Sequence, residues 1–162
     1  CWRNILGSDN NRNIGLSEII RMLENNVTFT QAADSVLECI TDSMDVCDAV
    51  VMQIDRESDT MHVISETGNC FKDESGTVKR SEFVLCSDAI KITYEGNADT
   101  AQKGLLDRLG VKLSITVPIL INNVKAMYLI VLSNDVQAVS DNKIKEYISD
   151  MALVLHSTEQ GN

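Results

Sequence analysis

Five cysteines and two histidines are the residues of this 162-residue chain that could carry redox chemistry or bind a metal. The cysteines are Cys1, Cys39, Cys47, Cys70 and Cys86. Their number is odd and no pair has CxxC spacing, so we expect reduced thiols rather than a disulfide framework. With only His62 and His156 beside them, no zinc-site spacing is present. The sequence therefore predicts neither a cofactor nor a metal.

The sequence also shows no recognisable catalytic grouping. No Ser/His/Asp set, glycine-rich phosphate loop or carboxylate pair stands out. His62 alternates on a predicted strand, where an exposed or hydrogen-bonded histidine is the common case. Asp88 could accept a hydrogen bond from a ligand, but a carboxylate in the first turn of a helix more often stabilises the helix dipole. We therefore expect that this chain is not itself an enzyme.

Composition and charge narrow the possible partners. The hydrophobic fraction of 44% and the charged fraction of 23% are typical of a soluble globular protein. The net charge of −10 argues against nucleic acid, whose phosphates require a basic surface. No apolar run approaches the roughly 18–20 residues that span a bilayer, and no signal peptide is visible. We expect a cytoplasmic location without membrane contact.

The chain opens without an initiator Met, which suggests a fragment of a longer protein. Its length is that of one domain. We place this domain at residues 14–158, after a polar lead-in at 1–13 and before a tail at 159–162.

The stretch 113–134 predicts a β-hairpin, because two apolar runs meet at Asn122-Asn123, a pair suited to a tight turn. A two-residue turn sets Ile121 opposite Val124. That register puts Leu113 and Leu132 on one face, and puts Ser114, Thr116, Leu129 and Val131 on the other. Both faces are largely apolar, so we expect both to be covered.

The remaining elements follow from hydrophobic spacing and capping signals. Thr28 and Gln31 form a capping-box pattern. Ser87 and Gly96 are read as the start and end signals of a short helix. Helices are expected at 16–24, from 28 to near 46, at 88–95, at 100–109 and after Ser140-Asp141. Strands are expected at 48–55, 60–66 and 81–86, together with the hairpin. Consecutive hairpins and terminal helices predict an α+β fold with an antiparallel sheet.

Residues 109–119 (LGVKLSITVPI), the return strand 124–134 and the terminal helix resemble the GAF family of small-molecule sensor domains. The sequence departs from the family pattern at Ser114, which lies one position later than the serine usual in GAF domains. The resemblance implies a central antiparallel sheet of five to six strands in a GAF/PAS-like arrangement. It further implies that the N- and C-terminal helices lie on one face, while short helices and loops cover a pocket on the other.

Carried onto this sequence, the resemblance implies a binding site for an unknown small-molecule effector. The implied ligand-binding residues are Cys86, Ser87, Asp88, Tyr94, Ser114, Thr116, Leu129 and Val131. It also implies a homodimer formed through the terminal helices. The expected output domain is a histidine kinase, a diguanylate cyclase or a transcription activator, as in bacterial two-component and related signal transduction.

Other readings of the same resemblance remain open. A bilin chromophore is disfavoured, because neither Cys70 nor Cys86 is followed by the usual His. Cyclic GMP is weakly supported, since Val139 occupies the place where a Phe is expected. A structural dimerisation module without a ligand is one alternative. Another is a GAF enzyme similar to free methionine sulfoxide reductase, although its Cys-containing motifs are not visible.

Overall fold

The computed structural model describes residues 27–71, 78–83, 85 and 88–161 of the chain. Expectations for 1–13 and for a helix at 16–24 lie outside these residues. The elements are α3 (Phe29–Ser43), β1 (Asp48–Asp55), β2 (Thr60–Glu66), the 3₁₀ helix η2 (Arg80–Glu82), β3 (Lys91–Tyr94), α4 (Thr100–Leu109), β4 (Leu113–Ile121), β5 (Ala126–Ser133), the 3₁₀ helix η3 (Val136–Val139) and α5 (Asn142–Gly161). No helix among the described residues is long and apolar enough to cross a membrane.

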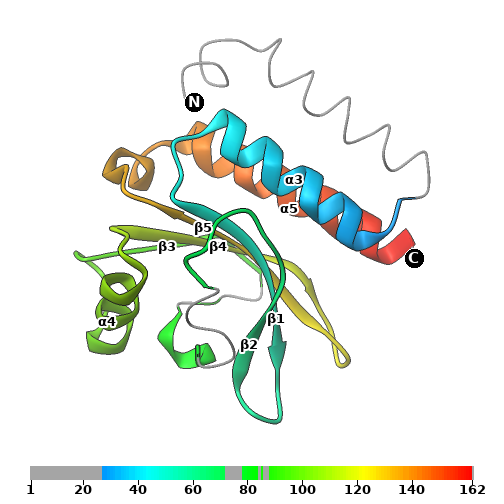
Figure 1. Ribbon diagram of the computed structural model, residues 1–162, viewed down its shortest axis with the longest axis horizontal. Helices are drawn as coiled ribbons and strands as arrows, with labels where there is room; N and C mark the ends of the chain where they lie inside the picture. Colours follow the sequence, from blue (N-terminus) through cyan, green and yellow to red (C-terminus); the bar gives the residue numbers. More distant parts are fainter. Residues whose placement is uncertain (1–26, 72–77, 84, 86–87, 162) are drawn as a thin grey trace.

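The five strands form one antiparallel sheet in the order β2-β1-β5-β4-β3. Figure 1 shows α3 and α5 side by side over one face of this sheet, which we call the helix face. The other face, which we call the second face, is covered by α4 and by the segment that contains η2. This arrangement confirms the predicted α+β fold, with its terminal helices together on one side.

The helix face is a continuous apolar core, because α3 carries its buried residues at helical spacing. Val36, Leu37 and Ile40 are fully buried there against residues of β1, β4, β5 and α5. The predicted capping box begins α3: the Gln31 amide donates to Thr28 Oγ1 at 3.2 Å, and the Thr28 amide donates to Gln31 Oε1 at 3.0 Å. The helix begins where its local sequence predicts.

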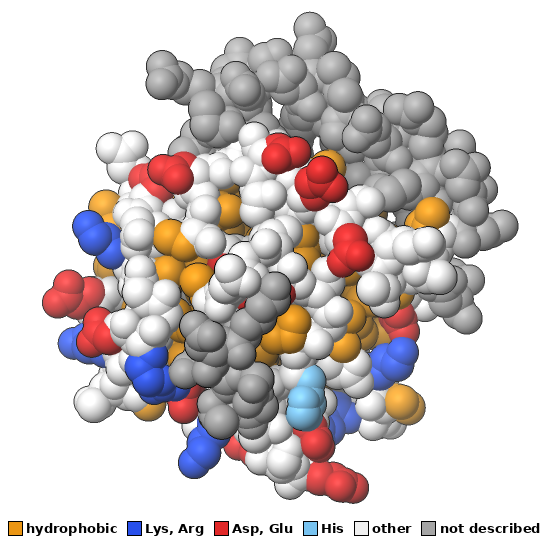
Figure 2. All heavy atoms as spheres, viewed as in Figure 1, with side chains coloured by type: hydrophobic (Ala, Val, Ile, Leu, Met, Phe, Trp, Pro, Cys, Tyr) orange, Lys and Arg blue, Asp and Glu red, His pale blue; other side chains and the backbone are white. Residues whose placement is uncertain are grey.

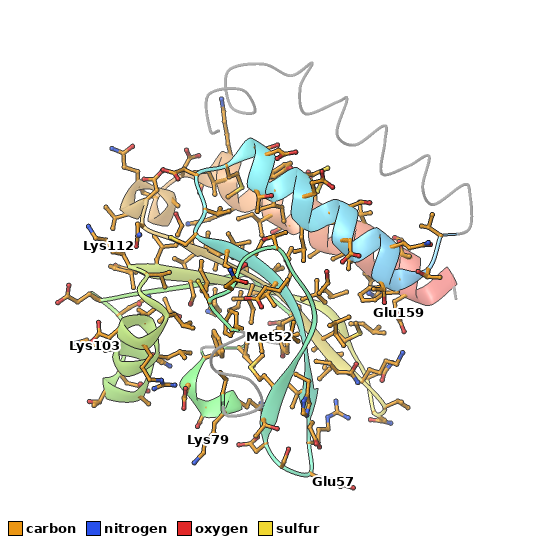
Figure 3. The ribbon with its side chains drawn as sticks, viewed as in Figure 1. Met52, Glu57, Lys79, Lys103, Lys112 and Glu159 are labelled. Atoms are coloured by element: carbon orange, nitrogen blue, oxygen red, sulfur yellow. The ribbon has the colours of Figure 1, made fainter. Side chains whose placement is uncertain are left out.

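The second face has its own apolar core. Val50, Met52 and Ile130 supply it from the sheet, and Leu105 and Phe71 are buried against them from the covering segments. Figure 3 shows Met52 in the middle of this layer, below the sheet. The sheet is therefore buried on both sides, as its apolar strands predict.

The predicted hairpin register is wrong by two residues at the turn and by one residue along the rest of the hairpin. The Asn122 side chain accepts from the Val124 and Lys125 amides at 2.8 and 2.7 Å, which holds a four-residue turn, and Ile121 pairs with Ala126. The pairing shifts again at an irregularity between Pro118 and Leu120. A one-residue slip moves side chains to the opposite face. Consequently Leu129 and Val131 pack in the helix-face core, not on the second face.

Two further expectations, a strand at 81–86 and a helix at 88–95, are also wrong. The 3₁₀ helix η2 occupies the start of the first segment, and β3 occupies the second. Gly96 lies in the turn after β3, where Asn97 Oδ1 accepts from the Tyr94 amide at 2.9 Å. The glycine read as a helix end is thus a turn residue after a strand. At the other end of the chain, α5 ends at Gly161, inside the range expected to be a tail.

Candidate ligand-binding site

The second face carries a row of polar residues under its apolar cover. Strand pairing places Asp48, Leu132, Ser114 and Thr93 next to one another across β1, β5, β4 and β3. Thr116 lies on the same face in the following row, beside Ile130. Since adjacent strands are about 4.8 Å apart, the row extends about 14 Å from Asp48 to Thr93. Leu132 separates Asp48 from the adjacent pair Ser114 and Thr93, so the row sets three polar residues into an otherwise apolar surface.

All of these polar residues are buried. The exposed fraction is 1% for Asp48, 3% for Thr93, 3% for Ser114 and 1% for Thr116. Thr116 Oγ1 makes a long hydrogen bond of 3.5 Å to the carbonyl of Lys91. Thr93 Oγ1 has no hydrogen-bond partner among the described residues. A buried hydroxyl without a partner costs free energy, so its presence calls for an explanation.

Asp48 is the charged end of the row. Its Oδ1 accepts from the amides of Ala49 at 2.9 Å and Gly68 at 2.7 Å, and from Thr67 Oγ1 at 3.4 Å. Its Oδ2 is buried and has no partner among the described residues. Hydrogen bonds to one oxygen therefore position the carboxylate, and the other oxygen is buried without a partner among the described residues.

Two thiols lie near Asp48. Burial raises the pKa of Cys70 to about 11, with further increases from the charges of Asp48, Cys47 and Glu66. Burial, then the charge of Asp45, raises the pKa of Cys47, and Asp48 adds to this increase. The thiolate is the reactive form of cysteine, so both thiols are less nucleophilic than ordinary ones. The described residues contain no cluster of metal-ligating side chains.

The residues predicted from the sequence to contact a ligand do not form one site. Ser114 and Thr116 lie on the second face, whereas Leu129 and Val131 are fully buried in the helix-face core. Tyr94 packs against the helix-face core and borders an open hollow of about 630 Å³ with Lys103, Lys112 and Val136. Lys103 and Lys112 point outward at this edge of the molecule (Figure 3).

Asp88 is exposed and borders a different hollow of about 610 Å³, between β4 and α5, which His156 and Ser149 also line. The His156 ring donates from Nδ1 to the carbonyl of Ile119 at 2.7 Å, because a carbonyl can only accept. Cys86 and Ser87 lie outside the described residues. Among the predicted residues that the structure describes, only Ser114 and Thr116 therefore lie in the polar row or directly beside it.

Sequence reasoning missed Asp48 and Thr93. Asp48 begins β1 at the same strand spacing as Val50 and Met52, so an acid in line with an apolar strand face was a signal in the sequence. Thr93 lies in the segment that capping signals assigned to a helix, which concealed its alternation with Ile92 and Tyr94.

Figure 2 shows acidic and basic side chains scattered over the visible side, with apolar patches between them.

Comparison with known proteins finds similarity at the level of structure alone. No family model matches the sequence, and no curated protein matches it. The phycoerythrobilin-bound GAF domain of a cyanobacterial phytochrome has a TM-score of 0.68 at 13% identity, with 96% of this chain and 98% of that chain covered. The A. aeolicus NLH2 GAF domain in an inactive state has a TM-score of 0.67 at 18% identity, over 93% and 96%.

A third neighbour is the GAF domain assigned to a sensor histidine kinase of Pseudomonas syringae pv. tomato. Its TM-score is 0.63 at 9% identity, with 98% of this chain and 94% of that chain covered. Because these alignments extend over nearly the whole of both chains, the likeness is one of the complete fold. This chain has the fold of a GAF domain.

Proposed function

We propose that this chain is a regulatory sensor domain that binds a small-molecule effector on the second face of its sheet. The observation that carries the proposal is the buried polar row, in which Asp48 Oδ2 and Thr93 Oγ1 lack partners among the described residues. Binding sites are mostly apolar surfaces with a few placed polar groups. Structural neighbours from a phytochrome and a sensor histidine kinase support a signalling role.

The mechanism in this proposal is differential binding. An effector that contacts Ser114 and Thr116 of β4 stabilises one conformation of the sheet. β4 is joined to α5 by the bond from His156 to the Ile119 carbonyl, and Lys125 of the following turn pairs with Glu159 of α5 at 2.5 Å. Figure 3 shows Glu159 near the end of α5. Through these contacts a change in β4 reaches α5, and from it an output domain such as a histidine kinase, a diguanylate cyclase or a transcription activator.

A thiol-dependent reductase is less well supported. Catalysis by cysteine requires a stabilised thiolate, whereas the pKa values of Cys47 and Cys70 are both raised. The alternative of a ligand-free dimerisation module makes a different prediction, because such a module needs no open polar atoms on the second face.

A thermal-shift screen with small molecules tests the sensor function. A ligand at about 100 times its Kd stabilises the folded state by about 2.7 kcal/mol, which is readily measured as a rise in Tm. We expect the rise to be reduced in Ser114→Ala and Thr116→Val, and retained in Ser65→Ala, a buried serine of the helix face. If no compound raises Tm and the chain is a stable dimer without one, the dimerisation module is the better account.

A further inference from the structure

Asp48 is the one charged residue of the polar row, and its surroundings specify what it can bind. We propose that Asp48 Oδ2 accepts a hydrogen bond from a protonated amine of the effector. This inference rests on the proposed sensor function and names the chemical class of its ligand. The supporting observations concern the occupancy of the two carboxylate oxygens, the local charge, and the position of Asp48 in the sheet.

The first observation is that the carboxylate is already oriented. Ala49 and Gly68 amides and the Thr67 hydroxyl all donate to Oδ1. Gly68 makes this approach possible, because a Cβ at that position would lie 2.8 Å from Oδ1 and 3.3 Å from the Cys47 carbonyl. The protein thereby fixes one oxygen and leaves Oδ2 without a partner among the described residues. Such preorganisation is what a binding group requires.

The second observation is the sign of the local charge. Asp48 and Glu66 lie on the same face of the sheet, since Glu66 pairs with Val50 and Asp48 is two residues before Val50. Their charges both act on Cys70, and those of Asp45 and Asp48 both act on Cys47. A negative potential in a buried site attracts a cation and repels a carboxylate or phosphate. An anionic effector is therefore disfavoured at this end of the row.

The third observation distinguishes among cations. Amidinium and guanidinium groups bind a carboxylate best through two parallel hydrogen bonds, one to each oxygen. Three donors already contact Oδ1 of Asp48, so a planar fork finds only one oxygen. An ammonium group is a compact charge that needs a single acceptor. The geometry favours an amine over an amidine or a guanidine.

The position of Asp48 also suits a ligand with an apolar body. Leu132 is its neighbour across the sheet, and Val50 follows on the same face; both are fully buried. Cys47, the residue before Asp48, is exposed, and Cys70 is half-buried. Asp48 is thus next in sequence to an exposed residue, and is itself 1% exposed. The expected effector is an amine attached to an apolar group.

Isothermal titration calorimetry with four small probes tests this inference on the intact chain. The probes are benzylamine, benzyl alcohol, benzamidine and phenylacetate, which share a phenyl ring and differ in the polar group. We expect benzylamine to bind at least about tenfold more tightly than benzyl alcohol, because a charge-assisted hydrogen bond is about twice as strong as a neutral one. Benzamidine should bind no more tightly than benzylamine, and phenylacetate should show no binding.

Two variants locate the binding. Asp48→Asn keeps an oxygen for the Ala49 and Gly68 amides but removes the charge, so benzylamine should bind at least about tenfold more weakly. Asp34→Asn makes the same change on the helix face, where Asp34 accepts from Ser65, and should leave benzylamine affinity unchanged. In the wild-type protein, the amide resonances of Ala49 and Gly68 should shift on titration with benzylamine, a readout that does not depend on the folding of a variant.

The outcomes separate this inference from the sensor function. The amine inference is overturned if benzyl alcohol or phenylacetate binds as tightly as benzylamine, if none of the four probes binds, or if Asp48→Asn leaves benzylamine affinity unchanged. A neutral or acidic compound whose binding is lost in Ser114→Ala would overturn the amine inference while supporting the sensor function. The sensor function itself fails only if the wider thermal-shift screen finds no ligand of any class.

Discussion

The two faces of the sheet differ in whether their buried polar groups are hydrogen-bonded. On the helix side, Ser65 donates to Asp34, Ser133 donates to the Asp45 carbonyl at 2.9 Å, and Thr158 donates to the Val154 carbonyl at 3.0 Å. On the second face, Asp48 and Thr93 each keep a buried oxygen without a partner among the described residues. Both faces exclude water from their apolar side chains, but only one satisfies its polar atoms.

This difference indicates a division of roles. A core whose polar groups are all paired contributes to stability, and buried polar atoms without partners reduce it. Proteins retain buried polar atoms without partners mainly at functional sites. Under the proposed function, the helix face is the structural face, and the second face is the one on which the chain gives up stability for binding. The predictions below test that division, beginning with the largest effect.

Truncation of Leu129 tests whether this side chain is buried in a packed core, as its place on the helix face requires. Leu129 is fully buried in the helix-face core, so Leu129→Ala should lower the free energy of unfolding by about 2–5 kcal/mol. Urea denaturation measures the change. Val124→Ala is the matched control, because Val124 is 82% exposed in the turn of the same hairpin and should change stability by less than about 0.5 kcal/mol. A small effect at Leu129 would contradict its burial in a packed core.

The thiol of Cys70 reports on the charge of the second face. With a pKa near 11, against 9.0 for an ordinary cysteine, its thiolate should be about a hundredfold scarcer at pH 8. Alkylation by iodoacetamide should therefore be slow and should accelerate toward pH 11. In Asp48→Asn the loss of one negative charge lowers the pKa, so alkylation at pH 8 should be faster. Fast alkylation in the wild type would show that the thiol is not buried beside acids.

The same raised pKa makes stability depend on pH. In the unfolded chain Cys70 loses its proton near 9.0, whereas in the folded chain it keeps the proton to about 11. Its contribution is therefore complete below pH 9 and decreases as pH rises toward 11, because the unfolded state then binds fewer protons. Urea denaturation across this range should show the decrease, and Cys70→Ser should show less of it. Equal slopes in both proteins would exclude Cys70 as the source.

Removal of a satisfied hydroxyl should destabilise the helix face. Ser133 Oγ donates to the Asp45 carbonyl and accepts from the Asp135 amide at 3.0 Å. Ser133→Ala leaves both groups without this partner and should lower the free energy of unfolding by about 1–3 kcal/mol. Ser157→Ala, at an exposed position of α5, is the control and should change little. A neutral Ser133→Ala would weaken the contrast between the faces.

Sequence signals correctly predicted those features of the fold that depend on contacts between residues close in the sequence. The capping box at Thr28 and Gln31 formed as expected because its partners are three residues apart. The existence of the hairpin was predicted from its apolar runs, but its register was not, since the Asn122 side chain selects the longer turn. The longer turn alone shifts the pairing by two residues and would keep the predicted faces. The irregularity between Pro118 and Leu120 leaves a net shift of one residue, which moved Leu129 and Val131 to the other face and removed them from the candidate site.

The part of the site that was missed depends on contacts between distant residues. Asp48 acquires its role from Gly68, twenty positions later, whose amide holds Oδ1. Thr93 acquires its role from strand pairing with Ser114, which a helix at 88–95 would have prevented. Ser114 and Thr116 were predicted on the second face because alternation within one strand is a local property. A single sequence does not show which residues of distant strands pair with one another.

The division between the two faces is tested most directly by replacing the Thr93 hydroxyl with a methyl group. Thr93→Val keeps the shape of the side chain and removes a buried oxygen that has no partner among the described residues. Its free energy of unfolding, measured by urea denaturation beside Ser133→Ala, should rise by about 1 kcal/mol, since the desolvation cost disappears. If Thr93→Val instead destabilises the protein as much as Ser133→Ala does, the hydroxyl is satisfied and the second face is an ordinary core.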